Sequence, residues 1–194
     1  MQTKMVRQIG RALLSDADFN RLLMDTLAWA SEYMAGEEVF APHVLAFYRQ
    51  PKGGHSLTVL VTPGWDDQRG KERILAGMGQ AAAESDEPLA AVFLVTEAWM
   101  TQRTAQDGPP DVPPSEDPAR QEVVVVSGST LDMRQNQAII HIEREEGRLA
   151  AGEVLSVPYI DDGQDEFQNW LLMQFLGAYA AEMMRRGRGK RPKM

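Results

Sequence analysis

Between residues 19 and 34, apolar side chains recur with the spacing of an amphipathic helix. Ser15, followed by Asp18, forms a start that resembles a capping box, and Gly36 supplies a stop. The same spacing predicts three further helices, at residues 4–13, 66–85 and 165–186. The helix over 66–85 carries the weakest pattern, because glycines interrupt it and glycine disfavours helix interiors.

The remaining apolar runs have the composition and short length of β-strands. Short glycine-containing turns join the first two runs and the last two runs, which makes those pairs antiparallel. The run at 90–96 is apolar on both faces, so it is predicted to be a central, covered strand. The predicted strands are residues 43–49, 56–62, 90–96, 121–126, 136–143 and 149–157.

The order of these segments is α-α-β-β-α-β-β-β-β-α. Helices and strands are segregated rather than alternating regularly, which predicts an α+β fold with a mainly antiparallel sheet packed with helices. The length suits one domain. We expect that domain to cover residues 1–184, followed by a flexible basic tail at 185–194.

A polar, proline-rich stretch at 101–120 separates the third and fourth predicted strands. It contains too little apolar surface to offset the entropy of ordering, so we expect an extended, mobile loop. Loops of this length in compact domains are uncommon and often functional, so any activity should be organised around it. Trp99, Pro110 and Pro113 are therefore candidates for binding a partner.

Charge is distributed very unevenly along the chain. The net charge is −8, yet 6 of the 20 basic residues fall in the last ten positions and all 28 acidic residues precede them. The acidic part of the chain before residue 185 repels nucleic acid, and only the basic tail could attract it. The chain has no cysteine, no apolar targeting segment and no run of membrane-spanning length, which favours a cytoplasmic location without membrane partners. The basic candidates for partner binding are Arg185, Arg186, Arg188, Lys190 and Arg191.

Sequence motifs for cofactors and nucleophilic catalysis are missing. There is no glycine-rich nucleotide-binding motif and no G-x-S-x-G; Gly128-Ser-Thr130 is interpreted as a turn. His141 and Glu143 share a strand face but do not complete a metal site. Acidic residues at 161–166 suit helix capping better than cation binding. We expect neither a cofactor nor a bound metal.

One location could support acid–base chemistry. Glu97 follows the central apolar run and precedes Trp99, so apolar surroundings could raise its pKa and make it a general acid or base. Arg120 would bind an anion or polarise a substrate, Asp117 would orient Arg120, and a bridge from Arg120 to Glu97 or Asp117 would close the loop over Trp99. An ordinary ion pair and an Asp-Pro turn explain the same residues.

The leading functional hypothesis is a non-enzymatic interaction or assembly protein. Large apolar helix faces, a proline-rich loop and opposite charges on body and tail occur without a catalytic constellation. Such a protein would bind a protein partner or self-associate, with a dimer as the favoured form. One alternative is a hydrolase using general acid–base chemistry near Glu97 and Arg120. Another is an accessory nucleic-acid contact through the basic tail.

Overall fold

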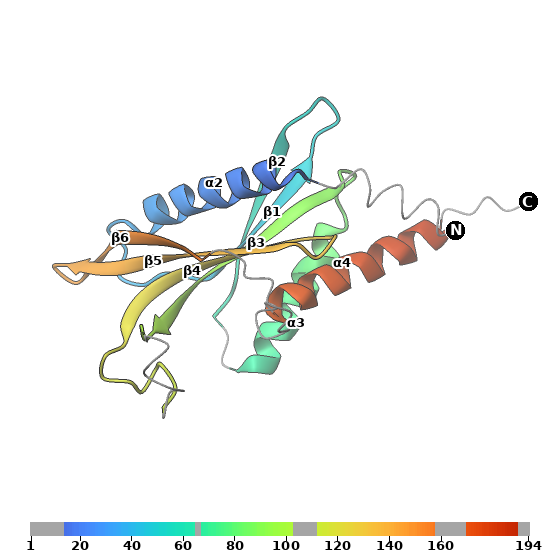
Figure 1. Cartoon of the computed structure of the whole chain (residues 1–194). Helices are drawn as coiled ribbons and strands as arrows, with labels where there is room; N and C mark the ends of the chain where they lie inside the picture. The colour runs from blue at the N-terminus through green and yellow to red at the C-terminus, as the bar shows by residue number, and fades with distance from the viewer. Residues whose placement is uncertain (1–13, 65–66, 103–111, 158–169, 190–194) are drawn as a thin grey trace, which may run out of the picture.

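The computed structural model describes residues 14–64, 67–102, 112–157 and 170–189 (Figure 1). A curled six-stranded antiparallel sheet runs in the order β2-β1-β3-β4-β5-β6, so the predicted α+β class is confirmed. In chain order the elements are α2 (Asp16–Met34), β1 (His43–Arg49), β2 (His55–Val61), α3 (Gln68–Ala82), β3 (Leu89–Met100), β4 (Gln121–Thr130), β5 (Gln135–Glu145), β6 (Arg148–Val157) and α4 (Trp170–Gly189).

The sheet is covered on both faces, by α2 on one side and by α3 and α4 on the other (Figure 1). Alternating residues of β3 feed the two cores: Phe93 and Val95 point toward α2, and Val92 and Leu94 toward α3 and α4. Strand β3 is the third strand of the six, which explains why its residues 89–95 are apolar and buried at every position.

Helix α2 begins and ends where its sequence predicts. The Ser15 hydroxyl accepts a hydrogen bond from the backbone N–H of Asp18 at 3.0 Å, which caps the start. Gly36, just beyond the helix, has a φ of 82°, a conformation that glycine adopts without strain. The apolar side of α2 then packs on the sheet through Phe19, Leu23 and other buried residues.

Helices α3 and α4 approach each other closely enough to require glycine. A Cβ added at Gly79 would overlap the backbone carbonyl of Phe175. The glycines that weaken the prediction for α3 therefore include one that allows this packing. On the sheet side, the Tyr179 hydroxyl accepts a hydrogen bond of 3.1 Å from the backbone N–H of Leu89, which ties α4 to the start of β3.

Two strands are longer than the sequence pattern indicates. Strand β3 continues to Met100 and β4 continues to Thr130, because the two pair along their whole shared length. Glu97 and Trp99 thus lie inside a strand rather than beyond its end. The interpretation of Gly128-Ser-Thr130 as a turn was wrong, because these residues lie opposite Phe93, Val92 and Ala91 of β3.

The described part of the proline-rich segment and the C-terminal helix also have structures that differ from the sequence-based predictions. Residues 112–120 form turns, with the N–H of Glu116 bonded to the Pro113 carbonyl, so this half of the loop is not extended. Helix α4 continues to Gly189, past the expected start of the tail. The helix predicted at 4–13, residues 103–111 and the chain from 190 onward lie outside the described residues.

Candidate functional site

Strand alternation places the sequence-predicted candidates Glu97 and Trp99 on the α2 side of the sheet. They continue the row of Phe93 and Val95, which belong to the core under α2. On β4, Glu122 lies directly opposite Trp99 and therefore on the same face. This face ends in polar side chains, which extend the row beyond the apolar core.

Arg144 of β5 joins the two carboxylates. Its guanidinium binds Glu122 through two hydrogen bonds, of 2.7 and 2.8 Å, and lies 3.9 Å from the Glu97 carboxylate. The same guanidinium donates to the Glu38 carbonyl at 3.2 Å, in the segment that follows α2. We call Glu97, Glu122 and Arg144 the carboxylate–arginine cluster. Its geometry connects β3, β4, β5 and the end of α2.

The pKa values of the two carboxyl groups in this cluster are shifted in opposite directions. Burial raises the pKa of Glu97, the nearby Glu122 charge raises it further, and Arg144 partly opposes both effects. The hydrogen bonds from Arg144 lower the pKa of Glu122. Glu97 is therefore the surplus carboxylate, because Arg144 is committed to Glu122. The prediction of a raised pKa at Glu97 agrees in direction with its surroundings.

Arg120 and Trp99 are in direct contact. The guanidinium carbon of Arg120 lies 4.8 Å from the centroid of the Trp99 ring, a cation–π geometry. One of its N–H groups donates to the Ser115 carbonyl at 2.9 Å. Asp117 accepts a hydrogen bond of 2.8 Å from the N–H of Ala119, which is the local turn capping that competes with a catalytic role. The end of the loop is thus fastened to Trp99.

Sequence reasoning allowed a bridge from Arg120 to Glu97 or to Asp117, and the structure places Arg120 over Trp99 instead of beside Glu97. Among the described residues, the cation that pairs with Glu97 is Arg144. Sequence reasoning missed Arg144 and Glu122, which lie on different strands from Glu97. The alternation of residues along each strand shows which face of the sheet Arg144 and Glu122 occupy. Without the register between strands, alternation cannot show which residues lie next to each other.

The basic candidates at the C-terminus are only partly described. Arg185 and Arg186 lie on α4 and both bind Glu182, at 2.5 and 2.9 Å, and Arg186 also lies 3.4 Å from Glu84. The pairs with Glu182 lie within the last turns of α4, and the pair with Glu84 joins α4 to the residues that follow α3. The described part of the structure does not include Pro110, Lys190, Arg191 or the side chain of Arg188. The carbonyl of Pro113 accepts the turn hydrogen bond from the N–H of Glu116.

The histidines occupy separate surroundings. His43 is buried against the rings of Trp29 and Tyr33, and its Nδ1 lies 2.6 Å from the Ala41 carbonyl oxygen. His141 lies on β5, opposite Val123 of β4. No group of three or more metal-ligating side chains occurs within the described part of the chain.

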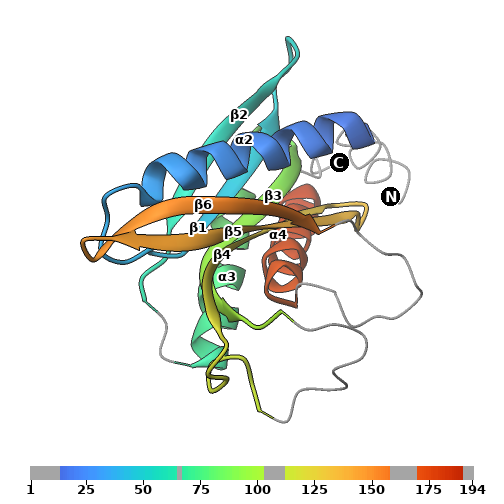
Figure 2. The same cartoon turned by 60° about the vertical axis from the view of Figure 1, so that its left-hand side comes forward.

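A second surface, which sequence reasoning did not single out, lies at the β2 edge of the sheet. Leu57, Val59 and Val61 point to the α2 side, opposite Phe47, Leu45 and His43 of β1, yet their exposed fractions are 44%, 39% and 60%. We call these three residues the β2 edge stripe. The β1–β2 hairpin projects beyond α2, which is why the helix leaves them open (Figure 2).

The two edges of the sheet differ. Near the start of β6, Leu149 donates to the Glu37 carbonyl at 2.7 Å and accepts from the Gly36 N–H at 3.0 Å, so the outer side of this strand is bonded at that residue. Charged residues also protect β6, and the β5–β6 register shifts near Ile140. On the β2 edge, residues 56–61 include no charged side chain, and no backbone bond from another described residue reaches its outer side.

Comparisons with family models, with curated proteins and with solved structures each found no match. Among the residues described, no helix is both long enough and apolar enough to cross a membrane.

Proposed function

We propose that this protein is a non-enzymatic interaction and assembly protein that self-associates through strand β2. The observation that carries the proposal is edge strand β2, where residues 56–61 have no charged side chain, no backbone bond from another described residue reaches the outer side, and three aliphatic side chains are exposed on the α2 side. Natural proteins usually protect such edges with charges, prolines, bulges or covering segments, because an open edge pairs with other chains. The β6 edge of the same sheet has part of that protection, namely the backbone bonds at Leu149, the charged residues Arg148 and Glu153, and the register shift near Ile140.

A second copy of this chain fits the edge by symmetry. When two β2 strands pair antiparallel about a two-fold axis perpendicular to the sheet, directly opposite residues lie on the same face. Leu57, Val59 and Val61 of one copy therefore meet the same stripe of the other. The pairing satisfies backbone groups along both edges, and burying each half-exposed aliphatic side chain contributes about 1 kcal/mol.

The charges at the two ends of β2 also suit antiparallel pairing. Lys52 lies in the hairpin before β2, and Asp67 follows β2 at the start of α3. Antiparallel pairing carries the hairpin of each copy toward the segment before α3 of the other. Opposite charges approach at both ends of the interface, whereas parallel pairing would bring like charges together.

The test is the molar mass in solution, measured by light scattering over a range of concentrations. The full chain is expected to be a dimer, and Val59→Lys is expected to be a monomer because lysines would meet across the axis. Val154→Lys is the matched control, since Val154 is 45% exposed on the opposite edge strand, and this variant should remain a dimer.

Circular dichroism would establish that both variants are folded. A monomeric wild type at all concentrations contradicts the proposal, and so does a Val59→Lys protein that keeps the mass of a dimer. Loss of the dimer only in Val154→Lys would place the interface on β6 instead.

A second candidate function is hydrolysis by general acid–base chemistry. It is favoured by one observation, namely that burial raises the pKa of Glu97 next to the Trp99–Arg120 pair. Glu97→Gln would abolish any ester or phosphoester hydrolysis detected in a substrate panel, whereas Glu143→Gln, on the same sheet, would leave it unchanged. Activity that survives Glu97→Gln removes this candidate.

A further inference from the structure

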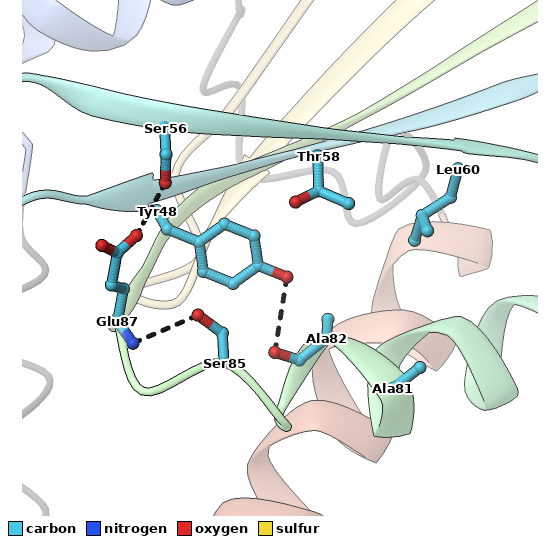
Figure 3. Close-up of a pocket in the computed structure, with 8 residues that line it drawn as sticks. All are labelled: Tyr48, Ser56, Thr58, Leu60, Ala81, Ala82, Ser85 and Glu87. Atoms are coloured by element: carbon cyan, nitrogen blue, oxygen red, sulfur yellow. Dashed lines mark hydrogen bonds between the residues drawn. The ribbon is translucent and has the colours of Figure 1, made fainter.

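An open cavity of about 260 Å³ lies between strand β2 and the C-terminal end of α3, on the face opposite the β2 edge stripe (Figure 3). Its volume is below the roughly 300–1,000 Å³ of pockets that hold drug-sized ligands, so it suits a molecule of few heavy atoms. The lining residues are Tyr48, Ser56, Thr58, Leu60, Ala81, Ala82, Ser85 and Glu87.

Glu87 gives this cavity a negative charge. Its carboxylate accepts two hydrogen bonds of 2.7 Å, from the Gln50 amide and the Ser56 hydroxyl. Both donors are neutral, and they bind the same oxygen, Oε2. Among the described residues no ion pair involves Glu87. The second carboxylate oxygen, Oε1, accepts no hydrogen bond from a described residue.

The end of α3 adds to this negative potential. The C-terminus of a helix carries a partial negative charge, which basic side chains in the last turn often offset. The last turn of α3 contains no basic residue, and Arg186 of α4, which approaches this end, is paired with Glu84 and Glu182. Ala81 and Ala82 of that turn line the cavity, so a cation there would be attracted by both the helix end and Glu87.

The rest of the lining is mostly apolar and suits contact with an alkyl chain. The Tyr48 ring, Leu60 and the two alanine methyl groups form apolar walls, and Figure 3 shows them around the same opening as Glu87. The Tyr48 hydroxyl donates to the Ala82 carbonyl at 3.3 Å. Burial raises the pKa of Tyr48 to about 12, so the hydroxyl stays protonated and adds no charge.

We propose that this cavity binds a primary alkylammonium group, with the ammonium at Glu87 and the alkyl chain along Tyr48, Leu60 and α3. The site does not depend on the proposed function, because it lies on the other face of β2. The same chemistry is available from a free aliphatic amine and from a lysine side chain of a peptide. These two sources differ only in what is attached to the alkyl chain.

The experiment is a titration of the isotope-labelled full chain with n-pentylammonium at constant ionic strength, followed by amide NMR shifts. We expect saturable shifts confined to residues around Ser56, Thr58, Ser85 and Glu87. The uncharged analogue 1-pentanol should bind at least about tenfold more weakly, because a hydrogen bond to a charged group is stronger than one between neutral groups.

Three variants test whether binding depends on this site. Glu87→Gln keeps the hydrogen-bond geometry but removes the charge, and should weaken pentylammonium binding about tenfold. Asp86→Asn removes the same charge from the neighbouring exposed residue outside the lining, and should leave binding unchanged. Thr58→Leu, which fills the opening, should abolish the shifts and provides a second variant if Glu87→Gln is unfolded.

Equal losses in Asp86→Asn and Glu87→Gln would overturn the proposal, since binding would then be only general attraction by an acidic surface. Equal binding of 1-pentanol, or an absence of saturable shifts, would overturn it as well. An acetylated lysine amide distinguishes the sources. Affinity at least equal to that of pentylammonium assigns the site to peptide lysine side chains, and weaker affinity assigns it to free amines.

Discussion

On the α2 side of the sheet, side chains fill the space between helix and strands, whereas on the other side two helices approach until their backbones nearly touch. Under α2, the ring of Phe93 lies 5.7 Å from that of Phe19 and 5.6 Å from that of Phe47. Between α3 and α4, Gly79 faces the Phe175 carbonyl with no room for a Cβ. The α2 side therefore joins its helix to the sheet through side chains, whereas the other side adds to its own side-chain core a backbone contact between two helices at Gly79.

This difference determines how each face should respond to change. Aromatic rings can shift by small rotations, so the α2 side has some capacity to accommodate added atoms. Two helix backbones in contact can only separate, which disturbs every residue along their interface. Hydrogen bonds differ as well, because the buried hydroxyl of Thr26 binds within α2, whereas that of Tyr179 binds a strand.

The largest effect is expected for Gly79→Ala. The added methyl group would overlap the Phe175 carbonyl and force α3 from α4, destabilising the protein by about 3 kcal/mol or more. Gly77→Ala is the matched control, because Gly77 lies in the same helix with nothing within 4 Å. It should stabilise by roughly 0.5–1 kcal/mol through helix propensity. Urea unfolding of both variants measures the difference, and equal effects would contradict the close packing of the two helices.

Gly128→Ala tests the α2 side in the same way. Its added methyl group would overlap the ring of Phe93, which is fully buried, and should destabilise the protein by about 2 kcal/mol. Phe93→Leu removes the obstructing ring, so the double variant should be more stable than the sum of the single effects predicts. Simple additivity in chemical unfolding would show that the ring is not the source of the strain.

Tyr179→Phe should destabilise by about 1–2 kcal/mol, because it leaves the buried N–H of Leu89 without its acceptor. Thr26→Val, the corresponding change under α2, should alter stability by less than about 0.5 kcal/mol. The Leu22 carbonyl that accepts from Thr26 at 2.7 Å also has its helical hydrogen bond. Thermal or urea unfolding of the two variants would decide, and a larger loss for Thr26→Val would reverse the comparison.

A small effect that depends on pH is expected where the α2 face ends, at Glu97. Its folded-state pKa is raised above the ordinary value of a glutamate side chain, so the ionised carboxylate destabilises the native state at neutral pH. That penalty is full above the folded pKa and disappears as the pH falls toward the unfolded value. Glu97→Gln should therefore stabilise by under about 1 kcal/mol at pH 7 and have no effect near pH 4.

Glu122→Gln provides the opposite sign. The pKa of Glu122 is lowered by its hydrogen bonds with Arg144, so its contribution to stability is present above the unfolded pKa and is lost as the pH falls through the folded pKa. This variant should be destabilised at pH 7, and its deficit should shrink on acidification. Unfolding curves at several pH values that show the same trend for both variants would contradict the assignment of Glu97 as the surplus carboxylate.

Local rules were enough to predict most helices and strands. Ser15, the apolar spacing that follows it and Gly36 act within one turn or one helix, so α2 could be derived without knowing its neighbours. The apolar run of β3 likewise indicated a central strand, because both faces of such a strand are covered. The ends of β3 and β4 were missed because a polar residue such as Glu97 stays in a strand only when a partner strand continues beside it.

The sequence by itself determined the α+β class, the cap of α2, the central position of β3 and the location of the Trp99–Arg120 region, since these depend on periodicity and on short-range chemistry. Only the tertiary structure decided that Arg144 joins Glu97 to Glu122, that β2 is an open edge, and that Glu87 faces a cavity at the end of α3. These features depend on strand order and register, which are set by the simultaneous packing of segments far apart in the chain.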